Sequence, residues 1–214
     1  MSRSDRRQWA APQTVTALGE PMARWLEGAI RSWPGYAPNH GPEPETAHLV
    51  PSLAALNRAG FLTTCSQPGL AGTGVDGLWW EQRAAAEGYI ADRPLYHRLL
   101  AAADDAGLTV VINDPGTRTY ETPEIVTTCD GEPVTAFGHL LGYRDMRVQW
   151  RGVSPAAFLD LAGAVSLAII APEYGTAGER LWPVLDLVTG LRADAPGCPW
   201  SPAPRQTARG GSRG

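Results

Sequence analysis

Apolar residues recur at intervals of three and four along much of the chain, the spacing that places them on one face of a helix. This spacing predicts helices over residues 16–33, 49–58, 94–106 and 155–161, and a closing helix from about residue 183. Gly60 and Gly107 follow two of these segments, and glycine commonly ends a helix because it accepts the left-handed backbone there. Ser154 precedes another segment and is typical of a helix N-cap.

Runs of β-branched and other apolar residues predict strands between these helices. They cover residues 61–64, 108–113, 124–129, 133–138, 146–150 and 166–171. Asp130-Gly131 joins two of them and is a strong signal for a tight hairpin. Residues 78–90 are ambiguous, since their alanines favour a helix while the aromatic residues at their ends favour a strand. The expected fold is therefore α+β, with a mixed, largely antiparallel central sheet flanked by helices.

The chain of 214 residues is long enough for one domain with a substantial core. Residues 1–12 are expected to form a flexible or strapped N-terminal arm, and residues 13–194 a single α+β domain. Proline, glycine, serine and arginine dominate residues 195–214, and this composition predicts a disordered tail.

Composition narrows the classes of function. A net charge of -4 argues against nucleic-acid binding, which normally requires a basic surface. The chain has no lysine, so a side-chain Schiff base is excluded. Its three cysteines are far apart and its four histidines share no metal-ligand spacing, so we expect no metal, no disulfide scaffold and a reducing cytoplasm. No apolar stretch approaches the roughly 20 residues that span a bilayer, so no membrane contact is expected.

Several short motifs have both a functional and a structural interpretation. Residues 72–77 read G-x-G-x-x-G, but no strand leads directly into them and no clear helix follows, as dinucleotide binding requires. Ser66 lacks the G-x-S-x-G surroundings of a hydrolase nucleophile. Cys65 is either a nucleophile or a small packed residue. Trp79-Trp80 either stacks on a ligand or packs against the domain.

The residues that follow the predicted strand at 61–64 form an unbroken polar run, from Thr63 to Gln67. Strand geometry places Thr63 and Cys65 on one side, and Ser66, past the expected strand end, is free to turn toward that side. Thr46 and Glu45 stand where the preceding helix begins, so helix start and strand end are expected to converge. The result is a carboxylate and three hydroxyls around one concavity, or alternatively a capped helix and an ordinary turn.

The polar run belongs to a longer pattern that consists of Glu45-Thr46, Asn57-Arg58-Ala59-Gly60 and Leu62-Thr63-Thr64-Cys65-Ser66-Gln67-Pro68. This pattern resembles the C-terminal regulatory domain of eukaryotic methylenetetrahydrofolate reductase, which binds S-adenosylmethionine and S-adenosylhomocysteine. The likeness covers most of residues 9–191, is strongest over 45–68, and favours a strand for residues 78–90. We also expect a family of stand-alone bacterial proteins of unknown function to share this core.

The resemblance implies a set of ligand contacts that comprises Glu45, Thr46, Thr63, Ser66 and Thr135, together with Ala17 from the segment that straps the ligand. The family's second threonine after the hairpin has no counterpart here, and Gln149-Trp150 occupies that neighbourhood. The implied ligand is S-adenosylmethionine or S-adenosylhomocysteine. The catalytic barrel of the reductase is absent, so folate and flavin chemistry do not follow.

Three hypotheses about function result. The first is a cytoplasmic sensor or carrier of an S-adenosyl nucleoside, without chemistry of its own and with a protein partner to regulate. The second is a small enzyme that acts on such a compound, with Cys65, Glu45 or His48 as candidate acid–base groups. The third is an interaction module that has kept the fold and lost the ligand.

Overall fold

The computed structural model describes residues 1–36 and 38–191. Its strands form one sheet in the order β5-β4-β8-β3-β6-β7, to which β1 and β2 also pair through β3. The strands are β1 (Phe61–Gln67), β2 (Ala71–Thr73), β3 (Trp79–Ile90), β4 (Thr109–Asp114), β5 (Thr119–Tyr120), β6 (Glu124–Cys129), β7 (Glu132–Phe137) and β8 (Val165–Tyr174). Every pairing is antiparallel, which confirms the expected α+β class.

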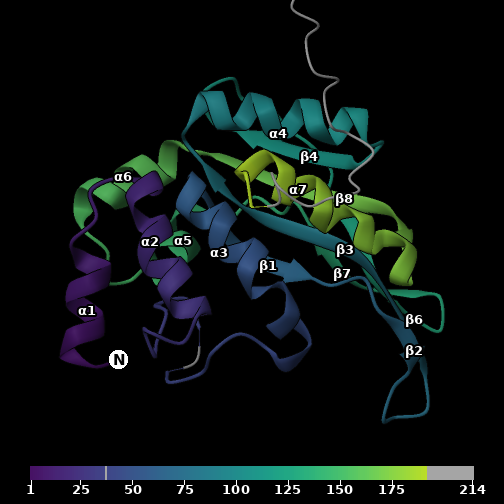
Figure 1. Cartoon of the computed structure of the whole chain (residues 1–214). Coiled ribbons are helices and arrows are strands. Elements are labelled where there is room, and N and C mark those ends of the chain that lie inside the picture. The colour runs from purple at the N-terminus through teal and green to yellow at the C-terminus, as the bar shows by residue number, and fades with distance from the viewer. Residues whose placement is uncertain (37, 192–214) are drawn as a thin grey trace, which may run out of the picture.

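Helices pack around this sheet, and several of them cover one of its faces. They are α1 (Arg3–Ala10), α2 (Val15–Leu26), α3 (Val50–Ala59), α4 (Arg93–Asp105), α5 (Tyr143–Gln149), α6 (Pro155–Gly163) and α7 (Leu181–Thr189), with the 3-10 helices η1 (Pro44–Leu49) and η2 (Gly175–Arg180). Figure 1 shows α2, α3 and α7 in front of the sheet and α4 along its upper edge. Helices α2 and α3 lie very close together, because an added Cβ at Gly19 would stand 1.9 Å from the main-chain oxygen of Asn57.

The long strand β3 organises the sheet. Its first residues pair with β2 and β6, and its later residues pair with β1 and β8. Arg83 lies where the pairing changes, and its Nε donates a hydrogen bond of 2.6 Å to the main-chain oxygen of Ala171. Ala84 and Ala86 belong to the main core, whereas Ala85 faces a smaller core with Phe137. Burial on both faces explains why β3 lacks the alternation of a half-exposed strand.

Several local signals in the sequence are confirmed. Gly60 ends α3 with a left-handed φ of 110°, and the Ser154 side chain accepts a hydrogen bond from the main-chain nitrogen of Ala157. Asp130 and Gly131 both have positive φ, as a tight two-residue hairpin between β6 and β7 requires.

Other predictions are wrong. Residues 146–150 belong mainly to helix α5, not to a strand, and the exposed Val148 does not share the buried side of Met146 and Trp150. Because Met146 and Trp150 are four residues apart, a helix buries both. The helix predicted over 16–33 ends at Leu26 and is followed by Gly28 with a φ of 78°.

The structure has strand residues in two segments where the sequence predicted none. β1 continues through the polar run to Gln67, and residues 71–73 form β2. The glycines of the G-x-G-x-x-G segment therefore lie in β2 and in a tight turn to β3, where the main-chain nitrogen of Gly74 donates to the oxygen of Leu78. A strand-to-strand turn of this kind does not offer the helix N-terminus that binds a pyrophosphate.

The expected N-terminal arm is a packed helix. Trp9 of α1 is fully buried, and its Nε1 donates a hydrogen bond of 2.9 Å to the main-chain oxygen of Ser32. The segment is therefore held against the domain. The tail predicted over residues 195–214 lies outside the described residues. No helix in the described ranges has the length and apolar character that crossing a membrane requires.

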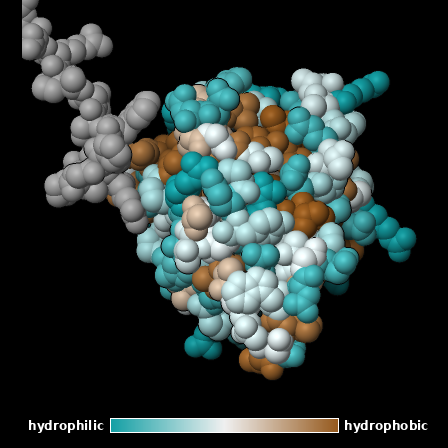
Figure 2. Space-filling view, turned by 90° about the vertical axis from the view of Figure 1, so that its right-hand side faces the viewer, coloured by the Kyte–Doolittle hydropathy of each residue, from teal (hydrophilic) through white to brown (hydrophobic). Residues whose placement is uncertain are grey.

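The β2–β3 hairpin carries exposed apolar side chains. Val75, Leu78 and Trp79 are all exposed there. Figure 2 faces the end of the molecule where this hairpin lies and shows apolar atoms interspersed with polar ones over that face. Trp79 and Trp80 thus belong to an outer hairpin, away from the helical layer that covers the core.

Candidate functional site

Asn57 of α3 fixes the start of the polar run. Its Nδ2 donates to the hydroxyl of Thr63 at 2.7 Å and to the main-chain oxygen of Leu53 at 2.8 Å. Its Oδ1 accepts a bond of 3.0 Å from the main-chain nitrogen of Thr63. Both side chains are buried, so these bonds lock the orientation of Thr63. The Thr63 hydroxyl still has its own hydrogen to donate.

A β-bulge then changes how the run is presented. Thr63 stands opposite Gly88 and Cys65 opposite Glu87, so Thr64 is an extra residue in β1. A bulge interrupts the strict alternation of side chains between two faces. As a result, Thr63, Thr64, Cys65 and Ser66 all line one cavity. The alternation expected from the sequence had placed Thr64 on the side opposite Thr63 and Cys65.

We call this space the aromatic cavity. It has a volume of about 130 Å³ and is lined by Met22, Trp25, Leu26, Trp33, Tyr36, Pro42, Glu43, Thr46, Leu53 and residues 63–66. The rings of Trp25 and Trp33 lie 5.3 Å apart, and those of Trp33 and Tyr36 are stacked at 6.3 Å. A flat apolar group would find aromatic walls here, with hydroxyl groups along one side.

A second space, the acidic cavity, adjoins the first. It has a volume of about 220 Å³ and is lined by Thr64, Cys65, Glu87, Tyr89, His139, Leu141, Gln149 and Ser166. Thr64 and Cys65 line both cavities. Each cavity by itself is smaller than the range of about 300–1,000 Å³ that is typical of small-molecule sites, so a ligand of that size would have to extend across both.

Carboxylates contribute negative charge to both cavities. Glu43 lines the aromatic cavity and Glu87 the acidic one, and no arginine among the described residues lines either. Burial raises the pKa of Glu87, although a bond of 2.6 Å from the main-chain nitrogen of Gly138 and the nearby His139 act in the opposite direction. A cationic ligand group beside Glu87 would relieve the cost of this buried carboxylate.

Glu87→Gln is expected to change the pH dependence of stability. A raised folded pKa means that the folded state favours the protonated carboxyl. The Glu87 carboxyl group therefore stabilises the folded protein fully at a pH below its ordinary pKa. This stabilisation is lost as the pH rises through the raised pKa of the folded state. Glutamine has no charge to bury, so we expect the variant to gain stability relative to the wild type as the pH rises from about 4 to 7.

Urea unfolding across this pH range measures the effect. The same substitution at the exposed Glu132 serves as the control, because that carboxylate lies on the surface of β7. A difference in unfolding free energy between wild type and Glu87→Gln that stays constant with pH would contradict the expectation.

The structure brings together three of the six residues that the resemblance implies as ligand contacts. Thr46, Thr63 and Ser66 all line the aromatic cavity. Glu45 is exposed and does not line it, whereas Glu43 does and accepts a hydrogen bond from the hydroxyl of Tyr36. Residues three apart share a face where the chain turns as a 3-10 helix, so Glu43, just before η1, aligns with Thr46.

The remaining two lie elsewhere. Ala17 is exposed on α2, where its main-chain nitrogen donates to the hydroxyl of Thr14 at the helix N-cap. Thr135 is half-buried in β7 opposite Thr127, which is hydrogen-bonded to Gln67. Neither Ala17 nor Thr135 lines the aromatic or the acidic cavity.

Sequence reasoning missed the aromatic walls and Glu87. Trp33 and Tyr36 flank a proline- and glycine-rich connection whose path the sequence did not predict. Glu87 lies in the segment that was ambiguous between helix and strand. A signal did exist in the neighbouring Gly88, because a glycine inside a strand often marks a close approach of another main chain.

Unpartnered polar atoms surround the two cavities. Trp33 Nε1, Gln149 Oε1 and Trp150 Nε1 are buried and have no hydrogen-bond partner among the described residues. The Trp33 and Trp150 rings are 5.8 Å apart, Trp33 lines the aromatic cavity and Gln149 lines the acidic one. Buried polar groups are normally hydrogen-bonded, so this concentration favours a site that is completed by water or a ligand.

The structure gives less support to the catalytic candidates that the sequence suggested. Cys65 is exposed at the surface, but partial desolvation and the Glu87 carboxylate raise its pKa to about 11, so it is a thiol at neutral pH, whereas the thiolate is the nucleophile. His48 is exposed and lines neither cavity. Over the described ranges, no group of three or more histidine, cysteine, aspartate or glutamate side chains is arranged to hold a metal ion.

A family profile with the description "Domain of unknown function (DUF6919)" matches residues 4–191. The chain belongs to this family. No match is found among curated proteins. Every residue that lines the two cavities falls within the DUF6919 range, so the cavities are part of the family domain itself. The expectation that this core defines a family of unknown function is confirmed.

Proposed function

We propose that this protein binds S-adenosylmethionine or S-adenosylhomocysteine across the aromatic and the acidic cavity and serves as a sensor or regulatory protein. One observation carries the proposal. Hydroxyls from η1 and from β1 meet in a single cavity with aromatic walls, next to a second cavity that is lined by the half-buried carboxylate of Glu87. These are the groups that an adenosyl amino acid would require.

The aromatic cavity suits the nucleoside part of the ligand. Adenine would stack against Trp25 or Trp33, and the ribose would reach the hydroxyls of Thr46, Thr63 and Ser66. If each hydrogen bond contributes about 0.5–1.5 kcal/mol, three or four contribute roughly 2–6 kcal/mol. Micromolar affinity corresponds to about -8 kcal/mol, so burial of the adenine would have to supply the remainder.

The acidic cavity suits the cationic part. Glu87 would pair with the sulfonium or the α-ammonium group, and Gln149 and His139 offer hydrogen-bond donors for the α-carboxylate. Because the described part of the chain places no arginine in either lining, Glu43 and Glu87 give the site a net negative lining. We therefore expect S-adenosylmethionine, which carries the sulfonium charge, to bind more tightly than its uncharged thioether counterpart.

The state of Cys65 argues against its use as a nucleophile. A thiol whose pKa is raised to about 11 is a poor nucleophile at neutral pH. Mass spectrometry after incubation with S-adenosylmethionine separates a binding role from an enzymatic one, because a new product would reject the sensor role.

Thermal shift and calorimetric titration with S-adenosylmethionine, S-adenosylhomocysteine, adenosine and methionine test the proposal. We expect Thr63→Val and Ser66→Ala each to weaken binding of the S-adenosyl compounds roughly 3- to 10-fold, since each removes one hydrogen bond. Thr135→Val is the matched control, because Thr135 lies outside both cavities, and its binding should equal that of the wild type. Absence of binding by both S-adenosyl compounds at millimolar concentration would reject the proposal.

A further inference from the structure

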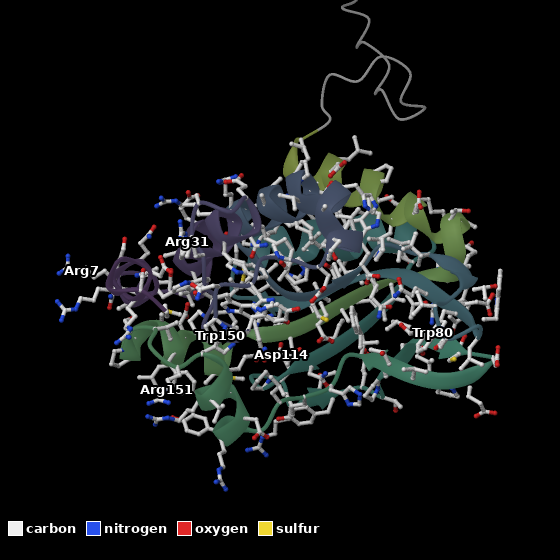
Figure 3. All side chains as sticks on the ribbon, turned by 90° about the horizontal axis from the view of Figure 1, so that it is seen from below. Arg7, Arg31, Trp80, Asp114, Trp150 and Arg151 are labelled. Atoms are coloured by element: carbon white, nitrogen blue, oxygen red, sulfur yellow. The ribbon has the colours of Figure 1, made fainter. Side chains whose placement is uncertain are left out.

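A third hollow lies at the end of the molecule where α1 meets the turn after α5. We call it the basic cavity; it has a volume of about 540 Å³, and its lining includes Arg6, Ser32, Trp33, Pro34, Tyr36 and Arg151. This volume falls within the range of about 300–1,000 Å³ that is usual for small-molecule sites. Figure 3 shows Arg151 at the same end of the molecule as Arg7 and Arg31, around Trp150.

The charged side chains of the basic cavity are all cationic. The Arg151 guanidinium makes no hydrogen bond, ion pair or ring contact with any described residue. Arg6 donates from Nε and Nη2 to the main-chain oxygen of Met1, at 3.3 and 3.2 Å, and has no carboxylate partner among the described residues. Over the same ranges no aspartate or glutamate lines the cavity, although the whole chain has a net charge of -4. Two guanidinium groups without counter-charges therefore face one hollow.

The lining of the basic cavity also includes flat, apolar side chains. Trp33 and Tyr36 stack with an interplanar angle of 14°, and Pro34 and Pro38 belong to the same lining. A ligand that satisfies both kinds of side chain has a flat ring to lie against the aromatic residues and an oxyanion to accept hydrogen bonds from the arginines. A phosphate monoester carries about -1.5 to -2 charges at pH 7 and so matches two guanidinium groups better than a single carboxylate does.

We propose that the basic cavity is a second ligand site, which binds a phosphate monoester attached to a flat ring, as in a nucleoside monophosphate. This site shares an aromatic wall with the adenosyl site proposed above but has its own charged residues. Trp33 and Tyr36 line both the aromatic and the basic cavity, but Arg6 and Arg151 line only the basic one. Substitutions at the two arginines therefore report on this site alone.

Calorimetric titration with adenosine 5′-monophosphate tests the proposal, with adenosine and inorganic phosphate as the two partial ligands. We expect the monophosphate to bind more tightly than either partial ligand, and its affinity to fall as ionic strength rises. Arg6→Gln and Arg151→Gln should each weaken this binding 10-fold or more. Arg7→Gln is the matched control, since Arg7 is the next residue of α1 but does not line the cavity.

Each outcome decides for or against the site. Equal binding of adenosine and the monophosphate would overturn the proposal, because the phosphate would then contribute nothing. An equal loss in Arg7→Gln would also overturn it, since the attraction would be a general property of the basic end. Thr63→Val should leave monophosphate binding unchanged, and the arginine variants should leave S-adenosylmethionine binding and the unfolding temperature unchanged. The two sites therefore succeed or fail separately.

Discussion

Gly88→Ala is expected to destabilise the fold by about 3 kcal/mol or more and to eliminate ligand binding with it. Gly88 of β3 stands opposite Thr63 of β1, and an added Cβ would lie 2.1 Å from the main-chain oxygen of Leu62 and 2.7 Å from the Cα of Thr63. Both of these atoms belong to the main chain. No side-chain rotation can relieve the contact, so β1 would have to move away from β3.

That movement would displace the residues that line the aromatic cavity, because β1 supplies Thr63 to Ser66. Urea unfolding and circular dichroism measure the loss of stability. Gly72→Ala is the matched control, since Gly72 is also in a strand that pairs with β3, but nothing lies within 4 Å of an added Cβ there. We expect that control to change the unfolding free energy by less than about 1 kcal/mol. If Gly88→Ala were as stable as Gly72→Ala, the close approach of β1 and β3 would be wrong.

Asn57→Leu is expected to lower the unfolding free energy by about 2–4 kcal/mol. The substitution keeps a side chain of similar size in a fully buried position, but removes the hydrogen bonds to Leu53 and to both the hydroxyl and the main chain of Thr63. The Thr63 main-chain nitrogen would then be buried without a partner. Leaving such a donor unsatisfied costs more than a typical hydrogen bond contributes.

Thr63→Val provides the comparison within the same contact. It removes the hydroxyl but keeps the bond between the Thr63 main chain and Asn57, so we expect a smaller loss, of about 1 kcal/mol. Chemical denaturation of both variants gives the order. A larger loss in Thr63→Val than in Asn57→Leu would contradict the view that Asn57 joins α3 to β1.

The sequence predicted those parts of the fold that depend on neighbouring residues. Gly60 ends α3, Ser154 caps α6, and Asp130-Gly131 turns the β6–β7 hairpin, since each depends only on local backbone conformation and hydrogen bonds. The strand predicted over residues 146–150 was wrong. Met146 and Trp150 lie on one side both in a strand, where side chains repeat every two residues, and in a helix, where residues four apart share a face. Which of the two formed depended on packing against Trp33 and Tyr89, which are distant in sequence.

The candidate site was likewise predicted only in part from the sequence. Sequence spacing correctly indicated that Thr46, Thr63 and Ser66 would meet, because a helix and a turn separate them along the chain. The predicted carboxylate was Glu45, but Glu43 lines the aromatic cavity instead, because the 3-10 geometry of η1 was not evident from the sequence. Glu87 and the aromatic walls come from segments brought in by β3 pairing and by the connection after α2.

The order of residues alone thus determined the helix ends, the tight hairpin and the gathering of hydroxyl groups, because these follow from conformational preferences over a few residues. Tertiary structure alone decided the bulge at Thr64, the partner of each strand and the carboxylate that lines the acidic cavity. Those features depend on contacts between residues far apart in the chain, and their free energies become available only once the sheet and the helical layer have packed together.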